Sequence, residues 1–152
     1  MGSETLTLRT VSEDDFAPWA ALWRGYLEFY GMVLPAEVYR TSFQRLLSPD
    51  PYSFQGLLAE RAGQAVGLAH FLFHPHMWRP EGVCYLQDLF ATPEARGTGV
   101  GRALIEAVYA AADRRGSPRV YWLTQTSNET ARLLYDRVGT QADFIRYDRR
   151  AG

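Results

Sequence analysis

Residues 84–101 carry three glycines at the point where an apolar segment gives way to a helix. Gly97, Gly99 and Gly101 occupy alternate positions directly before the helical spacing begins. A helix N-terminus has unpaired backbone N–H groups and about half a positive charge. Glycine lets an anion approach this backbone, because no Cβ intervenes and positive φ is permitted. With Arg96 as a nearby cation, the segment is typical of a turn that binds a diphosphate.

The glycine spacing excludes two common nucleotide-binding loops. A P-loop has the form Gly-x-x-x-x-Gly-Lys-Ser/Thr, and this chain contains no lysine. A dinucleotide-binding Gly-x-Gly-x-x-Gly sequence fails as well, because Arg102 or Leu104 falls where its last glycine belongs. A nucleotide-phosphate enzyme of either kind is therefore disfavoured.

What remains, Arg-Gly-Thr-Gly-Val-Gly at residues 96–101, resembles the coenzyme A pyrophosphate loop of the GNAT superfamily of N-acetyltransferases. The family pattern is Gln/Arg-x-x-Gly-x-Gly/Ala, and Arg96, Gly99 and Gly101 fill its specified positions. A second segment, residues 120–139, is similar to the family's strand–Asn–helix–Tyr segment, with Asn128 and Tyr135 at the matching places. The two motifs follow in the family's order, and the resemblance covers most of the chain.

The resemblance implies acetyl-CoA as co-substrate and a role for each matched position. Asn128 is expected to contact the pantetheine arm, and Tyr135 to lie near the sulfur as general acid. Main-chain groups of residues 89–91 are expected to face the thioester oxygen, which needs donors when it becomes an oxyanion. The expected coenzyme-binding residues are Leu89, Phe90, Ala91, Arg96, Gly97, Thr98, Gly99, Val100, Gly101, Arg102 and Asn128.

The proton acceptor has to be found separately. An alkyl amine has a pKa of about 10, so a base or a water chain must remove its proton at neutral pH. Small polyamine-type GNAT enzymes carry Glu-Asp where this chain has Gln87 and Asp88. Glutamine cannot accept a proton, which leaves Asp88, expected either to hold the substrate ammonium or to act through water. The resemblance also places the first helices beside the acceptor, and the expected acceptor contacts are Tyr26, Glu28, Tyr30 and Gln87.

The same residues have structural interpretations that stay open. Tyr135 falls on the apolar face of its predicted helix, Asn128 suits a helix N-cap, and Asp88 suits a cap or salt bridge at a sheet edge. The three histidines and Cys84 match no zinc-ligand spacing, so no metal is expected, and the histidines are expected on the surface of a loop. Cys84 lies within a predicted buried strand, which excludes a disulfide framework.

Composition predicts one folded domain spanning residues 1–152. Apolar residues make up 47% of the chain and aromatic residues 14%, values typical of a globular protein. The net charge of −1 gives no electrostatic reason to expect nucleic acid or an anionic membrane as partner. No apolar run reaches the length of a membrane span and no signal segment is recognisable, so a cytoplasmic location is expected.

Periodicity and turn residues predict an α/β fold. Expected helices cover residues 16–30, 35–47, 100–115 and 128–138, ended by Gly31, Gly116 and Gly139 where glycine follows them. Expected strands cover residues 5–10, 52–60, 65–74, 83–91, 119–126 and 142–147, with a loop at 75–82. The resemblance implies the GNAT fold: a mixed, mostly antiparallel central sheet with a splayed parallel strand pair and helices on both faces.

The expected function is acetyl-CoA-dependent N-acetylation of a primary amine of a small molecule or peptide, by direct transfer in a ternary complex. The matching branch of the family includes enzymes for polyamines, thialysine, histone tails and D-amino acids. The resemblance also implies a homodimer, with the terminal strand as a contact. The alternative is a non-catalytic acyl-CoA-binding sensor, which the glutamine at position 87 keeps open.

Overall fold

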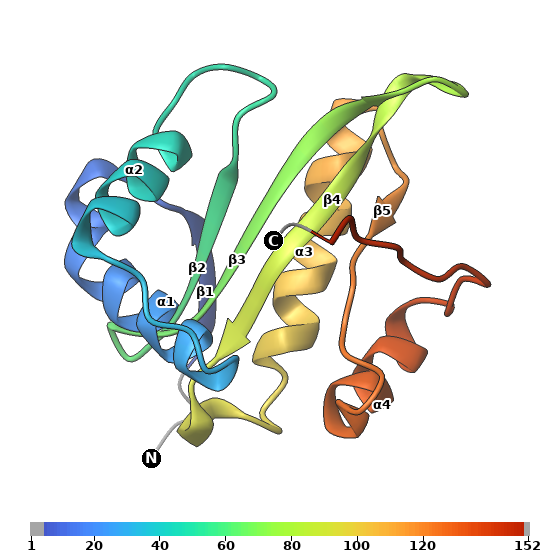
Figure 1. The fold of residues 1–152 in the computed structure, drawn as a ribbon. Coiled ribbons are helices and arrows are strands. Elements are labelled where there is room, and N and C mark those ends of the chain that lie inside the picture. The colour runs from blue at the N-terminus through green and yellow to red at the C-terminus, as the bar shows by residue number, and fades with distance from the viewer. Residues whose placement is uncertain (1–4, 151–152) are drawn as a thin grey trace.

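A five-stranded mixed sheet forms the centre of the molecule in the computed structural model, which describes residues 5–150 (Figure 1). The strands are β1 Leu6–Thr10, β2 Gln55–Arg61, β3 Gln64–His76, β4 Arg79–Ala91 and β5 Val120–Tyr121. They lie in the order β1-β2-β3-β4-β5; neighbours from β1 to β4 are antiparallel and β5 is parallel to β4. The predicted α/β fold class is confirmed.

Helices cover both faces of the sheet. They are α1 Phe16–Phe29, α2 Ala36–Leu46, α3 Val100–Arg115 and α4 Glu129–Val138, with short 3₁₀ turns η1 Glu13–Asp15 and η2 Pro93–Ala95. Figure 1 shows α1 and α2 on one side of the sheet and α3 on the other. Two apolar clusters result, one around Trp19 and Phe43 and the other around Phe71 and Leu104. Among the described residues, no helix is both long and apolar enough to cross a membrane.

The predicted loop at residues 75–82 is wrong, because β3 and β4 continue through most of it as a hairpin. His76 pairs with Arg79, and only Met77 and Trp78 form the turn. Pro75, which cannot donate a ladder hydrogen bond, sits at a register shift between His74 and His76. The strand therefore continues past Pro75, and the proline is accommodated at the register shift.

The last two predicted strands are also corrected. Only Val120 and Tyr121 of the predicted strand 119–126 pair with β4. Residues 142–147 form no strand, and Phe144 is 88% exposed. Their sequence favours extended backbone, but a strand also needs a neighbouring strand to pair with. Within the described chain, β5 has only two residues and offers few backbone groups for such pairing.

A β-bulge in β4 explains why the parallel pair is so short. His70 pairs with Asp88 and Phe71 with Leu86, which leaves Gln87 without a partner on β3. Leu86 packs into the cluster beneath α3, whereas Phe90 packs into the cluster beneath α1. The extra residue thus turns the second half of β4 over, and the pairing with β5 stops just before it.

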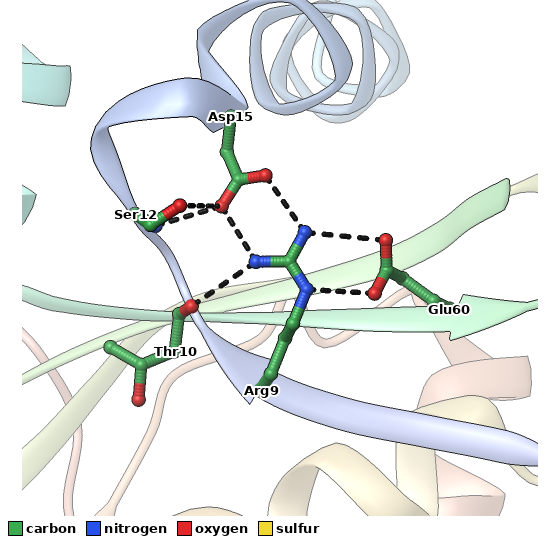
Figure 2. Close-up of polar contacts among 5 residues, drawn as sticks. All are labelled: Arg9, Thr10, Ser12, Asp15 and Glu60. Atoms are coloured by element: carbon green, nitrogen blue, oxygen red, sulfur yellow. Dashed lines mark hydrogen bonds and ion pairs between the residues drawn. The ribbon is translucent and has the colours of Figure 1, made fainter. Parts of the chain in front are cut away.

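One arginine connects β1, β2 and the start of α1 (Figure 2). Arg9 on β1 donates to both oxygens of Asp15, at 2.7 and 2.8 Å, and its Nε donates to Glu60 on β2 at 2.7 Å. Asp15 also accepts hydrogen bonds from the backbone N–H and the hydroxyl of Ser12. These bonds from Arg9 lower the pKa of Asp15 despite its burial.

We expect Arg9→Met to lower the free energy of unfolding at neutral pH by about 1–2 kcal/mol, because the arginine side chain is partly exposed. The lowered pKa of Asp15 means that this stabilisation is present above the unfolded value of about 3.9 and fades as the pH falls toward the folded value. Urea unfolding at pH 7 and in acid measures it, with Arg40→Met on the exposed face of α2 as control. An equal difference from wild type at both pH values would contradict this assignment.

Candidate functional site

The largest of the three cavities described here is a groove of about 610 Å³. It runs from α1 past the end of β4 to the start of α3, and α4 forms its other wall. Its lining residues from the predicted set are Tyr26, Tyr30, Leu89, Phe90, Ala91, Arg96, Gly97, Gly99, Val100, Gly101, Arg102, Asn128 and Tyr135. The structure thus brings both sequence motifs to one groove.

The start of α3 presents unpaired backbone donors to this groove. Gly99 precedes the helix with a φ of 90°, a left-handed conformation that glycine adopts without strain. Among the described residues, the first helical hydrogen bond of α3 is donated by the N–H of Ala103 to Gly99 O, at 3.0 Å. The N–H groups of Val100, Gly101 and Arg102 precede it and are available to an anion.

Arg96 lies across the entrance of the groove. Its Nε donates to the carbonyl oxygen of Ala91 at 3.2 Å, and its guanidinium lies 5.7 Å from the ring of Phe29 and 5.8 Å from that of Phe90. These contacts hold a cation beside the helix start. Arg102 instead pairs with Glu106 on the exposed side of α3, at 2.7 Å.

Thr98 and Glu28 are the two predicted site residues with no place in any of the three cavities described here. The hydroxyl of Thr98 donates to Ala95 O and accepts from Arg61, so its side chain stabilises the turn. Glu28 is exposed on α1.

The edge of β4 that faces the groove is open beyond the bulge. Leu89, Phe90 and Ala91 pair with β3 on one side, whereas β5 pairs only with Cys84 and Tyr85 on the other. Backbone N–H and C=O groups on the unpaired edge can therefore hydrogen-bond to an extended ligand chain.

Asn128, at the N-cap of α4, and Tyr135, on α4, line the wall of the groove opposite α1. Asn128 caps α4 by accepting a hydrogen bond from the N–H of Ala131 at 3.4 Å, so its structural interpretation holds alongside its position in the groove. Tyr135 packs edge-on against Trp122, with ring centres 5.5 Å apart. Burial, followed by the nearby Tyr30, raises the pKa of Tyr135 to about 12, so the phenol keeps its proton at neutral pH.

Gln87 lines both of the two smaller cavities described here. One shares Tyr26, Tyr30, Leu89 and Tyr135 with the groove. The other has a volume of about 80 Å³ and is lined by Asp88 and His70, with Arg45 at α2. Gln87 therefore lies between the groove end and the buried carboxylate.

Asp88 and His70 form a buried pair, which corrects the expectation for His70. His70 Nδ1 lies 2.8 Å from Asp88 Oδ2, and the indole Nε1 groups of Trp19 and Trp23 donate to His70 Nε2 at 2.8 Å and to Asp88 Oδ2 at 3.3 Å. His70 belongs to β3 and is 5% exposed, so it is no surface loop histidine. Asp88 lies beyond Tyr85, the last residue of β4 that pairs with β5, so its interpretation as a sheet-edge residue stays open.

The described residues form no cluster suited to a metal ion, and the cysteine among them is buried. Residues 5–150 contain no group of three or more histidine, cysteine, aspartate or glutamate side chains placed to hold a metal ion. Cys84 is fully buried, and this burial raises the pKa of its thiol to about 12.

Comparison with known proteins agrees with this geometry. Residues 19–140 match the model of the acetyltransferase (GNAT) family. The D-amino-acid N-acetyltransferase HPA3 of Saccharomyces cerevisiae is 39% identical over 150 residues, covering 98% of this chain and 93% of that protein. The uncharacterized N-acetyltransferase YhfO of Bacillus subtilis is 26% identical, covering 93% and 95%.

Among solved structures, the aminoglycoside N-acetyltransferase AAC(6')-Iy in complex with CoA has the same fold, with a TM-score of 0.83 at 19% identity over 99% of this chain and 98% of that one. The chain belongs to the GNAT acetyltransferase family and is an N-acetyltransferase.

Proposed function

We propose that this protein transfers the acetyl group of acetyl-CoA directly to a primary amine of a small molecule or peptide, and that residues 1–152 act as one acetyltransferase domain. The observation that carries the proposal is the continuity of the groove: the helix start, the open β4 edge and Tyr135 line one space. A diphosphate at one end and a thioester at the other fit that order of groups.

The coenzyme is bound mainly by backbone groups in this proposal. The N–H groups at the start of α3 hold the diphosphate, and Arg96 adds its charge. The pantetheine arm lies along the open edge of β4, with Asn128 beside it. Leu89, Phe90 and Ala91 then place backbone donors near the thioester oxygen, where negative charge develops during attack.

Tyr135 is the general acid. The attacking amine adds to the thioester carbon, and collapse of the tetrahedral intermediate breaks the C–S bond and leaves a thiolate. A phenol with its pKa raised to about 12 is protonated at neutral pH and can give that proton to the sulfur. No nucleophile is needed in this scheme, which suits the buried and protonated state of Cys84.

Amino acids are the first acceptors to test, because a relative 39% identical is named a D-amino-acid N-acetyltransferase. The cavity of about 80 Å³, which shares Gln87 with the cavity that adjoins the groove, offers Asp88 for an ammonium group and Arg45 for a carboxylate. Polyamines and basic peptides complete the panel.

Release of free thiol only in the presence of an amine supports the enzyme. Tight acetyl-CoA binding without release on any amine indicates a non-catalytic sensor.

We expect Gly99→Val to weaken acetyl-CoA binding at least about tenfold, or 1.4 kcal/mol. A branched side chain at a φ of 90° strains the turn and places a Cβ where the diphosphate approaches. Gly63→Val is the matched control, because Gly63 has a φ of 76° in the β2–β3 turn, outside the groove. Both variants lose stability, but calorimetric titration should find lower affinity only in Gly99→Val. Unchanged affinity there would exclude this phosphate site.

Tyr135→Phe should lower kcat about 100-fold or more, while the Kd for acetyl-CoA stays close to the wild-type value. The matched control is Tyr109→Phe on α3, whose hydroxyl donates to Val138 O at 2.6 Å outside the groove. That variant should lose stability but keep kcat. Full activity of Tyr135→Phe in steady-state assays of thiol release would remove the tyrosine from the chemistry.

We propose that a second copy of the chain covers the exposed segment 142–147, as the family resemblance implies. Phe144, Ile145 and Tyr147 are 88%, 79% and 87% exposed, a costly arrangement for three large apolar side chains together. Ile145→Asp should convert a dimer into a monomer in size-exclusion chromatography with light scattering, whereas Met77→Asp at the hairpin tip should not. A monomeric wild-type protein at micromolar concentration would contradict the dimer.

A further inference from the structure

Trp122 lines the smallest of the three cavities described here, and the sequence assigned no role to it. The cavity has a volume of about 20 Å³ and shares Tyr26, Tyr30, Leu89 and Tyr135 with the groove. Its other lining residues are Leu86, Gln87, Trp122 and Leu123. Because Tyr135 lines both spaces, the cavity adjoins the end of the groove where the proposed function places the thioester.

Pairs of aromatic rings form two walls of this cavity. Tyr26 and Tyr30 lie at the end of α1 with their ring centres 5.1 Å apart. Tyr135 on α4 meets the ring of Trp122 edge-on, with ring centres 5.5 Å apart. A third wall is Leu86 of β4, which is 2% exposed. Large side chains therefore enclose the space on several sides.

The ring of Trp122 is held from two further directions. Its centre lies 6.3 Å from that of Tyr109 on α3. A Cβ added at Gly139, the C-cap of α4, would lie 3.0 Å from the Trp122 ring. The ring thus packs directly against the Gly139 backbone, which leaves it little room to move on that side. A ring packed in this way keeps the cavity at a fixed size.

The cavity holds about one water-sized group. A water molecule needs a space of roughly 10–15 Å³ in the same measure. The nitrogen of a primary amine with its hydrogen atoms has a similar size, so it fits. Tyr30, Gln87 and Leu123 are the exposed members of the lining and mark the opening toward solvent. The carbon chain of an acceptor can leave the cavity through this opening.

A nitrogen in this cavity has four bonding directions to place. During attack, one points to the thioester carbon in the groove, and a second carries the carbon chain through the opening. The other two face the walls formed by the aromatic rings and Leu86. Hydrogen atoms fit there, whereas a methyl group on the nitrogen needs the volume of a further water-sized group.

We propose that this cavity restricts the acceptor to amines with an unsubstituted nitrogen, and that Trp122 is a specificity-determining residue that sets the limit. The inference rests on the proposed acetyl transfer. Primary and secondary amines both carry the one N–H hydrogen that is lost as the N–C bond forms, and the thiolate released from the broken C–S bond takes up one proton in either case. The chemistry itself therefore accepts both classes, and the space around the nitrogen discriminates between them.

Size and charge can be tested separately in this cavity. The eight lining residues, all within the described part of the chain, have uncharged side chains. Gln87→Glu keeps nearly the same volume and adds a carboxylate. Trp122→Phe keeps an aromatic ring against Tyr109 and Tyr135 but fills less space. The first variant changes charge alone and the second changes size alone.

The test compares kcat/KM for the best primary amine of the acceptor panel with kcat/KM for its N-methyl counterpart, followed by thiol release. For an amino acid the pair is D-alanine and N-methyl-D-alanine, and for a polyamine it is putrescine and N,N′-dimethylputrescine. In the wild-type protein the primary amine should be favoured at least about tenfold. The uncatalysed reaction of each amine with acetyl-CoA gives the intrinsic difference, for which the ratio is corrected.

Trp122→Phe should lower this ratio at least about threefold by raising kcat/KM for the N-methyl amine. Tyr30→Leu enlarges the opposite wall and should act in the same direction; its ring is 41% exposed, so its loss disturbs the core little. A variant that only weakens the fold lowers both kcat/KM values and leaves their ratio unchanged. Thermal melting followed by circular dichroism checks that each variant is folded.

Leu133→Ala is the matched control for size, because Leu133 is 62% exposed and lines the groove but not this cavity. Its ratio should equal that of the wild-type protein. Gln87→Glu should lower KM for the primary amine about threefold or more, because a carboxylate binds an ammonium more strongly than an amide does. Its ratio should also stay at the wild-type value, since both amines carry the same charge.

Equal corrected kcat/KM values for primary and N-methyl amines in the wild-type protein would overturn the size limit alone. So would an unchanged ratio in folded Trp122→Phe and Tyr30→Leu, or a shift of the same size in Leu133→Ala. Absence of thiol release from the wild-type protein with every amine would instead overturn the proposed function, and the size limit with it.

Discussion

The unpaired Gln87 on β4 is the constraint on which the rest of this structure depends. One extra residue turns Asp88 and Phe90 toward α1 and stops the pairing with β5. Backbone hydrogen bonds that a continuous sheet would satisfy internally are left open along the end of β4. The cost of that opening is tolerable only where a ligand or water completes the bonds. A single local irregularity thus creates both the groove and the orientation of the acidic side chain beside it.

The two faces of β4 then serve different parts of the chemistry. In the proposed function, the face toward α3 and α4 meets the coenzyme, and the helix dipole and glycine backbone do most of the binding. The face toward α1 holds a carboxylate among aromatic rings, where a charge is felt strongly because little water screens it.

Local signals predicted most of the fold and the glycine turn that precedes α3. The glycines at 97–101 and the helical spacing that follows depend on short-range geometry, which sequence reports directly. The errors all involve pairing over a distance: a hairpin that continues through Pro75, a β5 that stops after Tyr121, and a segment 142–147 that has no partner in its own chain.

The buried histidine was missed for a related reason. His70 was grouped with His74 and His76 because they are close in sequence. Its position two residues after Leu68 on a predicted strand placed it on the same inward face, and that alternation was the signal available. The register that sets it opposite Asp88 depends on the bulge, which no short stretch of sequence specifies.

Helix α4, which forms one wall of the groove, is less buried than the rest of the fold. None of its residues is fully buried, and it joins the sheet through a strand of two residues. Leu134, Tyr135 and Val138 pack against the apolar cluster beneath α3, and the Tyr109 hydroxyl donates to Val138 O. A ligand that fills the groove would add apolar contacts to the exposed side of this helix and bind the folded state alone. The coenzyme would then act as a removable piece of the hydrophobic core, and this half of the protein would gain rigidity when its co-substrate is abundant.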